Sequence, residues 1–534
     1  MRGAARRLGW APLVAAPAAA VLLLATAVLV PWIADARASA RSGCPPIRNK
    51  PHQVPHVHYA GVRHLTYCDG PITVAPGQNI IRLNRTDLFP KQSGYITRFD
   101  PELVYTNGRV PRVDVLHLHH AVWVVNNSPQ FAVGEEKTIQ QLPKGFGWRT
   151  EPTDHWLVND MLHDLVGQQA RVYIVWRIDF VPDTAPSAAS IHKVETHWMS
   201  VAGNQSPAGS RYPSGLFYPV FNALRGMGKH GRFTFPDQAK GAQRQLVPAS
   251  QSWTPDHPVT LIGTAGHLHP GGLYTDLQVQ RGDRHRRLFR SKAHYYEPAG
   301  EVSWDVAMTG TPLSWRVKVR RGDTLSVHAT YNTRRASWYE VMGIMPVAVY
   351  DGTDVGGRDA FSKEIPQKGV LTHGHLSEND HHGGRPAGLP NPLALPNGPF
   401  TSGPIDIKDY QYTHGSLYAP KRAARPPTIR AGQSLTFKNL DATGAGSLNA
   451  YHTITACRAP CNRSTGIAYP IANGSHTFDS GELGVNYGGV PVANAPASGK
   501  VTWSTPKNLN PGTYTYFCRI HPFMRGSFRV VNRK

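Results

Sequence analysis

The feature that most constrains the fold of this chain is its patterning in short alternating runs. Apolar and polar residues alternate in stretches separated by Pro and Gly turns, at residues 79–83, 113–117, 170–181, 314–319 and 324–328. A period of two is typical of half-buried strands, whereas apolar residues recurring every three to four positions indicate a helix. Helical periodicity is scarce in this sequence. We therefore predict an all-β protein.

Length and composition set the scale of the molecule. The chain has 534 residues, 40% of them hydrophobic and 17% charged, which corresponds to about three domains and argues against disorder. The formal net charge is +22, but the basic residues are scattered and follow no Lys/Arg and aromatic stripe. This distribution indicates a solvated basic surface and excludes nucleic acid as the expected partner.

The N-terminal segment has the organisation of an export signal. Arg2, Arg6 and Arg7 precede an apolar stretch over residues 9–34, and Ala-x-Ala patterns follow up to residue 40. The uninterrupted apolar part, residues 18–30, is shorter than the roughly 20 residues of a membrane span. We predict that residues 1–40 are a signal peptide. An uncleaved anchor stays open as an alternative, and either form places the globular part outside the cytoplasm.

The five cysteines fall into two close pairs and one single residue. Cys44 and Cys68 lie near the expected mature N-terminus, and Cys457 and Cys461 are four positions apart. In an oxidising compartment each pair is expected to form a disulfide. Cys518 is left over, and metal ligation is the leading explanation for a single thiol in such a compartment.

Cys518 lies in the most informative segment of the chain, residues 516–526. Cys518, His521 and Met524 fall within seven residues on a turn between two predicted strands. A mononuclear blue-copper site takes one thiolate, two imidazoles and a weak axial thioether. A second histidine, His452, lies upstream on a predicted strand. We therefore predict a type 1 copper bound by His452, Cys518, His521 and Met524.

The Cys-x-x-His-x-x-Met spacing, with Pro522 and Phe523 inside it, resembles the cupredoxin family, the amicyanin and plastocyanin type in particular. The resemblance covers residues 404–534 and implies a Greek-key β-sandwich that transfers electrons. One departure is a longer stretch between the first histidine ligand and Cys518, which contains the pair Cys457–Cys461.

Two histidine motifs lie in the first two thirds of the chain. His117, His119 and His120 end a strand-like run, where a period of two places the first two on one face and His120 on the other unless a bulge intervenes. His267 and His269 are two positions apart, so both imidazoles leave one face of a strand and can bind one ion. A thioether soft enough for Cu(I) follows at Met342.

The order of these motifs, His-His, then His-x-His, then Glu-x-Met, resembles the copper type II monooxygenases, which include peptidylglycine α-hydroxylating monooxygenase and dopamine β-monooxygenase. The resemblance spans residues 68–350 and implies two jelly-roll domains with one copper each. It assigns His119 and His120 to an electron-transfer copper. It assigns His267, His269 and Met342 to the catalytic, dioxygen-activating copper.

The sequence departs from that family at the electron-transfer copper. The family's third histidine ligand lies on a strand whose equivalent here, residues 172–179, contains no histidine. His117, His192 or His197 would have to replace it, or the site is two-coordinate or lost. The disulfides of the family are also mostly missing, and its substrate-binding residues have no matching positions.

The sequence thus predicts two jelly-roll-like β-sandwich domains (41–205 and 206–350), a Gly/Pro/His-rich linker (351–403) and a cupredoxin domain (404–534). The predicted function is an exported copper-dependent monooxygenase that hydroxylates a C–H bond, with one type 1 and up to two type 2 coppers.

Its partners would be dioxygen, a small-molecule or peptide substrate, and an external reductant or redox protein. Membrane contact would occur only through an uncleaved N-terminus. The alternative is a non-catalytic copper-binding or electron-transfer protein. Substrate, electron donor and oligomeric state stay open.

Overall fold

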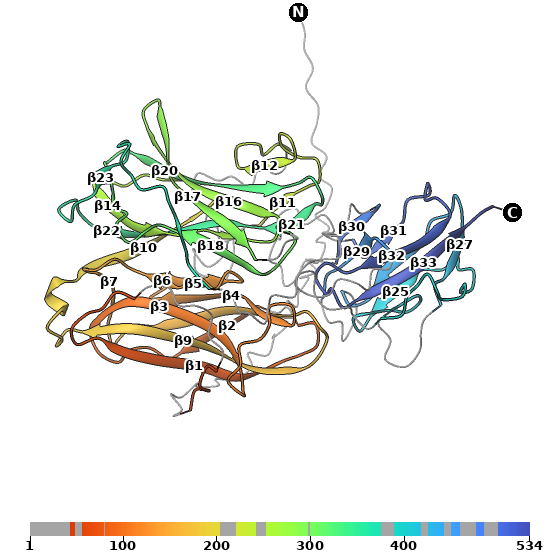
Figure 1. Cartoon of the computed structure of the whole chain (residues 1–534), viewed down its shortest axis with the longest axis horizontal. Helices are drawn as coiled ribbons and strands as arrows, with labels where there is room; N and C mark the ends of the chain where they lie inside the picture. Colours follow the sequence, from red (N-terminus) through yellow and green to blue (C-terminus); the bar gives the residue numbers. More distant parts are fainter. Residues whose placement is uncertain are drawn as a thin grey trace, which may run out of the picture. The chain divides into compact units, whose positions relative to one another are not determined.

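The computed structural model describes residues 43–48, 56–78, 81–202, 220–241, 252–296, 300–374, 389–417, 425–442, 450–459, 477–484 and 500–533. The predicted signal segment and Cys461 lie outside these ranges. Within them, the secondary structure consists of β-strands and one short 3-10 turn, η1 (Ala188–Ser190). The prediction of an all-β fold is confirmed (Figure 1).

The first β-sandwich packs one side of a long sheet against a four-stranded sheet in the order β2-β8-β4-β5. The long sheet contributes strands in the order β1-β9-β3-β7. The bounds are β1 (Arg63–Val74), β2 (Ile81–Thr86), β3 (Gly94–Tyr105), β4 (Leu116–Val125), β5 (Ser128–Gly134), β6 (Gln140–Gln141), β7 (Phe146–Thr150), β8 (Trp156–Asp164) and β9 (Ala170–Pro182). Between the sheets, Phe99 lies 4.2 Å from Phe131 and 4.7 Å from Trp123, measured between ring centroids.

The long sheet continues from the first sandwich into the second through β10 (His192–Ser200). The first part of β10 pairs in parallel with β7, and its second part pairs antiparallel with β22. Strands β14, β19 and β23 complete this sheet, and β15 pairs with β22. The bounds are β14 (Val259–Thr264), β15 (His267–Leu268), β19 (Val317–Val319), β22 (Gly343–Tyr350) and β23 (Arg358–Asp359).

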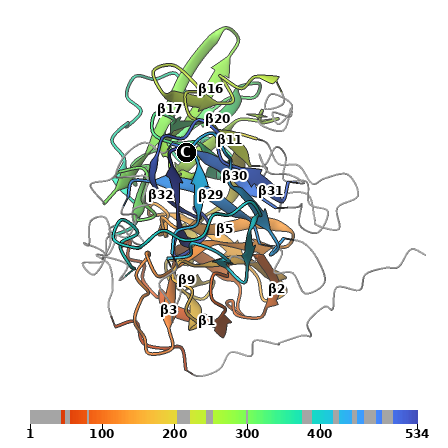
Figure 2. The same ribbon diagram turned by 90° about the vertical axis from the view of Figure 1, so that its right-hand side faces the viewer.

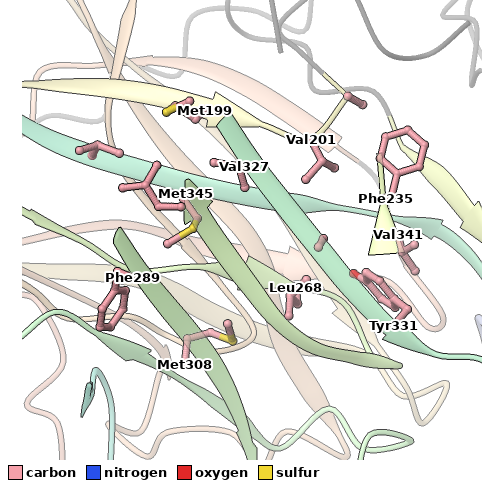
Figure 3. Packing of buried hydrophobic residues seen from close by; sticks show 14 of the residues in the cluster. Met199, Val201, Phe235, Leu268, Phe289, Met308, Val327, Tyr331, Val341 and Met345 are labelled. Atoms are coloured by element: carbon pink, nitrogen blue, oxygen red, sulfur yellow. The ribbon is translucent and has the colours of Figure 1, made fainter. Parts of the chain in front are cut away.

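A seven-stranded sheet in the described part of the chain faces this second half, and a hydrophobic core lies between them. In Figure 3, Leu268, Met345, Val327 and Tyr331 belong to this core. The remaining bounds are β11 (Phe221–Ala223), β12 (Arg232–Phe235), β13 (Ser252–Trp253), β16 (Gly272–Arg281), β17 (Arg284–Tyr295), β18 (Val306–Gly310), β20 (Thr324–Asn332), β21 (Trp338–Val341) and β24 (Val370–Leu371).

The C-terminal sandwich consists of the sheets β27-β33-β32-β29-β30 and β26-β25-β28-β31. Strands β29 and β32, which flank the predicted copper ligands, are hydrogen-bonded neighbours (Figure 2). The bounds are β25 (Ile405–Lys408), β26 (Gln411–Tyr412), β27 (Thr428–Arg430), β28 (Thr436–Asn439), β29 (His452–Cys457), β30 (Asp479–Leu483), β31 (Thr502–Ser504), β32 (Gly512–Phe517) and β33 (Arg525–Val531). All described residues belong to one unit, Ala38–Lys534.

The disulfide between Cys44 and Cys68 is present, as predicted. Cys457 is also disulfide-bonded, but its predicted partner Cys461 lies outside the described residues. Cys518 is a free, buried thiol. None of the described segments contains a helix long and apolar enough to span a membrane.

Two segments differ from the strand pattern expected of them. Residues 113–115 form a turn, so β4 begins only at Leu116. Within the predicted linker, β23 pairs with β19 and β24 pairs with β18, while Ala360 and Ile365 are buried in the second core. Strands of two residues are too short to show an alternating pattern. The Gly, Pro and His content of the segment was therefore the only signal in the sequence, and it is typical of a linker.

Replacement of Phe99 by alanine tests the packing of the first sandwich. The ring is fully buried, so its loss leaves a cavity and we expect Phe99→Ala to destabilise the protein by about 3–5 kcal/mol. Denaturant unfolding followed by tryptophan fluorescence measures this change. Leu313→Ala, at a side chain that is 39% exposed, is the control and should change stability by less than about 0.5 kcal/mol.

Candidate metal centres

The thiol of Cys518 and two imidazoles form a small triangle in the C-terminal sandwich. The Cys518 Sγ atom lies 3.7 Å from His452 Nδ1 and 3.7 Å from His521 Nδ1, and the two Nδ1 atoms are 3.2 Å apart. All three side chains are buried. An ion at the centre, with metal–ligand distances of about 2.0–2.3 Å, requires a triangle of this size. The donors therefore fit a three-coordinate metal site.

The surrounding hydrogen bonds orient these donors around a common centre. His452 donates from Nε2 to Asp441 Oδ2 over 2.9 Å, which leaves Nδ1 facing the sulfur. The backbone amides of Thr453 and His521 donate to Cys518 Sγ over 3.3 and 3.4 Å. Burial opposes the thiolate, but the hydrogen bond and charge of His452, together with the hydrogen bonds from the Thr453 and His521 amides, outweigh burial and lower the pKa of Cys518. A thiolate is the form that binds a metal ion.

Met524 closes the loop that carries Cys518 and His521. Its carbonyl accepts a hydrogen bond from the Cys518 amide over 3.0 Å, and its own amide donates to the His521 carbonyl over 2.9 Å. The side chain is buried in the same core as Cys518. The ring of Tyr410 covers the two histidines, 4.9 Å from His521 and 5.7 Å from His452 between centroids.

A second group of histidines lies in the first sandwich. His117 and His119 leave β4, and His163 leaves β8, where it pairs directly with His117. One ring nitrogen from each of the three lies within 4.8 Å of the others. Among the described residues, His117 Nε2 and His163 Nδ1 are buried without a hydrogen-bond partner. Buried polar atoms are rarely left unsatisfied, so these nitrogens point to a bound ligand.

The histidines of the second sandwich join this group. Leu268 points into the hydrophobic core in Figure 3, so the side chain of His267, its neighbour in β15, leaves the other face of the strand. His269 follows directly after β15. The rings of His269 and His119 are 5.1 Å apart. A metal-compatible group also forms from His119, His269 and the buried carboxylate Glu135. The motifs that the sequence separates by about 150 residues thus form one continuous cluster.

Two carboxylates from the turn after β5 complete the cluster. A carboxylate oxygen of Glu135 contacts Nδ1 of His119, and Glu136 Oε2 accepts a hydrogen bond from His267 Nδ1 over 2.9 Å. Imidazoles suit copper, zinc and iron, and two imidazoles with one carboxylate are the donor set of non-haem iron oxygenases. The donors of this cluster therefore fit copper, zinc or iron.

Burial controls the protonation of this cluster. It disfavours the imidazolium and lowers the pKa values of His119, His163 and His269 to about 3, and it raises the pKa of Glu135 to about 7. For His267, burial acts in the same direction, but the Glu136 carboxylate outweighs it and raises the pKa to about 9. At neutral pH most of these rings are neutral and can ligate a metal, whereas His267 is paired with Glu136.

Not every predicted ligand joins a group of donors. His120 donates from Nε2 to Asn159 Oδ1 over 3.3 Å, although its ring is 5.8 Å from that of His119. The ladder of β15 with β22 ends at the pair Leu268 and Gly343. Beyond it, the Tyr331 hydroxyl accepts a hydrogen bond from the His269 amide and donates one to the Met342 carbonyl, so the two backbones lie close together.

Three histidines, His117, His192 and His197, were suggested as the third ligand of the electron-transfer copper. Of these, only His117 lies in a donor group among the described residues. His192 packs on Tyr350 and His197 on Trp253. Three members of the cluster are absent from the predicted ligands: His163, Glu135 and Glu136. His163 ends a strand and shares no motif with another histidine. The two glutamates lie in a charged turn, a composition typical of the surface, yet both are buried.

Solved structures similar to parts of this chain include two kinds of copper protein. No family model and no curated protein matches the chain. A Cu(I) form of a methionine-to-alanine mutant of amicyanin is similar, with 18% identity over 27% of this chain and 93% of that chain and a TM-score of 0.13. A copper-containing nitrite reductase from Thermus scotoductus SA-01 is also similar, with 14% identity over 53% of this chain and 59% of that chain and a TM-score of 0.15.

Removal of the carboxylate behind His452 tests the first centre. In Asp441→Asn the carboxylate that orients the His452 ring loses its charge and one of its two acceptor oxygens, so we expect metal affinity to fall about 10–100-fold. Titration with Co(II), followed by the thiolate-to-metal absorption band, measures the affinity. Asp406→Asn, in β25 of the same sandwich, is the matched control, and an equal loss in both variants would contradict the assignment.

Proposed function

We propose that this chain is an exported, copper-dependent monooxygenase that hydroxylates a C–H bond with dioxygen and carries its own electron-transfer domain. The buried triangle of Cys518, His452 and His521 supports a type 1 copper, because a thiolate and two imidazoles are its equatorial donors. The predicted export signal at residues 1–40 is part of this proposal.

The cluster between the first two sandwiches is the proposed site of dioxygen activation. His267 and His269 carry this role together with Met342, and His119, with His117 and His163, holds the electron-transfer ion. A monooxygenation consumes one dioxygen, two electrons and two protons for each C–H bond, and it releases water. The protein must therefore deliver electrons one at a time to this cluster.

The proximity of the two centres is the observation that carries the proposal. The ring of His163, in the cluster, lies 6.4 Å from the ring of His521, in the copper triangle, between centroids. A one-electron carrier whose ligand nearly touches a ligand of the second centre is arranged to supply that centre. A copper-storage protein has no need of such contact.

One observation favours the non-catalytic alternative. His267 donates to Glu136 and has its pKa raised to about 9 by that carboxylate, against the effect of burial. A protonated His267 has no lone pair for a metal ion. In that case the cluster retains only a partial site, and the chain would act as an electron-transfer or copper-binding protein.

Metal analysis with oxygen-uptake measurements separates these functions. We expect the copper-loaded protein to bind more than one ion and, given a reductant, to consume dioxygen. His269→Ala should abolish oxygen uptake and keep the blue absorption, whereas Cys518→Ser should abolish the blue absorption. A protein that binds a single copper and shows no reductant-dependent uptake would be an electron-transfer protein. Elemental analysis also distinguishes copper from iron at the cluster.

A further inference from the structure

We propose that His163 is a two-sided residue: its Nδ1 ligates the ion of the three-histidine group, and its Nε2 docks the Cys518 loop and passes electrons to that ion. This inference rests on the proposed function, which it deepens by naming the connection between the two centres. The sequence motifs do not include His163, and the two resemblances assign it no role.

The geometry of the two ring nitrogens carries the argument. His163 Nε2 donates a hydrogen bond of 2.7 Å to the carbonyl of Ile520. Ile520 directly precedes the copper-triangle residue His521. On the other side of the ring, Nδ1 is buried, has no hydrogen-bond partner among the described residues and belongs to the group with His117 and His119. One imidazole thus spans the space between the two centres.

Arg519, the residue before Ile520 in the loop, contacts the second sandwich. The Arg519 guanidinium lies over the rings of Trp338 and Tyr339, at 5.1 and 5.3 Å from their centroids, and it donates to Asp479 over 3.2 Å. Tyr339 also donates to Asp479 over 3.2 Å. The two residues between Cys518 and His521 therefore each contact a different sandwich: Ile520 the first, and Arg519 the second.

Aromatic residues in and near the Cys518 loop pack closely against the first two sandwiches. A methyl group on Gly167, after β8, would lie 3.0 Å from the Phe523 ring, and one on Gly77, before β2, would lie 3.1 Å from the Tyr410 ring. Phe517, just before Cys518, is buried in the core of the second sandwich. The loop is thus packed against both sandwiches, as a fixed electron path requires.

The path itself is short. It runs from the His521 ring through its backbone to the Ile520 carbonyl, across one hydrogen bond, and into the His163 ring. With copper bound at both centres, one electron would pass along it: the ion held by Cys518 would go from Cu(I) to Cu(II), and the ion held by the three histidines from Cu(II) to Cu(I). No covalent bond forms or breaks, and no proton moves.

Two substitutions of His163 separate its roles. In His163→Gln the side-chain amide nitrogen takes the place of Nε2, so the docking hydrogen bond is kept and the metal ligand is lost. In His163→Asn the amide takes the place of Nδ1, so the docking hydrogen bond is lost. His117→Asn is the matched control, because His117 belongs to the same group but hydrogen-bonds Val113 within its own sandwich.

Hydrogen–deuterium exchange of the metal-free full-length protein measures docking. We expect the amides of residues 518–524 to exchange at least tenfold faster in His163→Asn than in the wild type, and at unchanged rates in His163→Gln and His117→Asn. Unchanged exchange in His163→Asn would overturn the docking role.

Pulse reduction of the copper-loaded protein measures the path, with the return of the blue absorption as the signal. We expect intramolecular electron transfer to slow at least tenfold in His163→Asn and less in His117→Asn. Equal rates in the two variants would overturn the path. If electron transfer follows this pattern but no oxygen is consumed, the proposed oxygenase function fails and the link stands. If the wild type binds no ion at the three histidines, both the path and the proposed function fail.

Discussion

The metal-binding cluster depends on one strand, β10, which hydrogen-bonds to both of the first two sandwiches. His192 to Val194 pair with β7 of the first, and Glu195 to Ser200 pair with β22 of the second. Because one sheet runs through both, the sandwiches cannot turn independently about a flexible linker. In this arrangement the ring of His119 in β4 lies 5.1 Å from that of His269 between centroids.

The fixed position of the sandwiches explains how so many titratable side chains stay buried together. Taking imidazoles and carboxylates out of water is costly unless they are paired or ligated. Some of the cost is offset within the cluster, where Glu136 pairs with His267 and Glu135 contacts His119. The nitrogens of His117 and His163 that have no hydrogen-bond partner among the described residues are not offset by pairing, and a bound metal ion would supply the missing interaction. The same cost makes this cluster the candidate functional site.

Features that depend on residues close together in the sequence could be predicted from it. Alternation located strands such as β9, predicted at 170–181 and observed from Ala170 to Pro182. The thiol left unpaired by the other cysteines led to the Cys518 loop, whose candidate ligands fall within seven residues and need only a turn to meet. A type 1 copper site takes two imidazoles and the loop supplies only that of His521. The search for a second histidine therefore led to His452, on a distant strand.

The cluster was harder to predict because tertiary structure assembles it. His163 carries no local motif and meets His117 only through strand pairing, and Glu135 and Glu136 occupy a turn whose charge suggests exposure. Nothing in local spacing reveals that β10 brings two distant histidine motifs together. The resemblance to copper type II monooxygenases placed two separate coppers in two domains, whereas here the donors form one continuous group.

Anomalous diffraction at the copper absorption edge, from crystals of the copper-loaded protein, tests the central claim most directly. The account predicts one peak inside the triangle of Cys518, His452 and His521, and at least one more among His117, His119, His163, Glu135 and His269. Peaks confined to surface histidines, or an empty cluster beside an occupied triangle, would contradict the account of two connected centres.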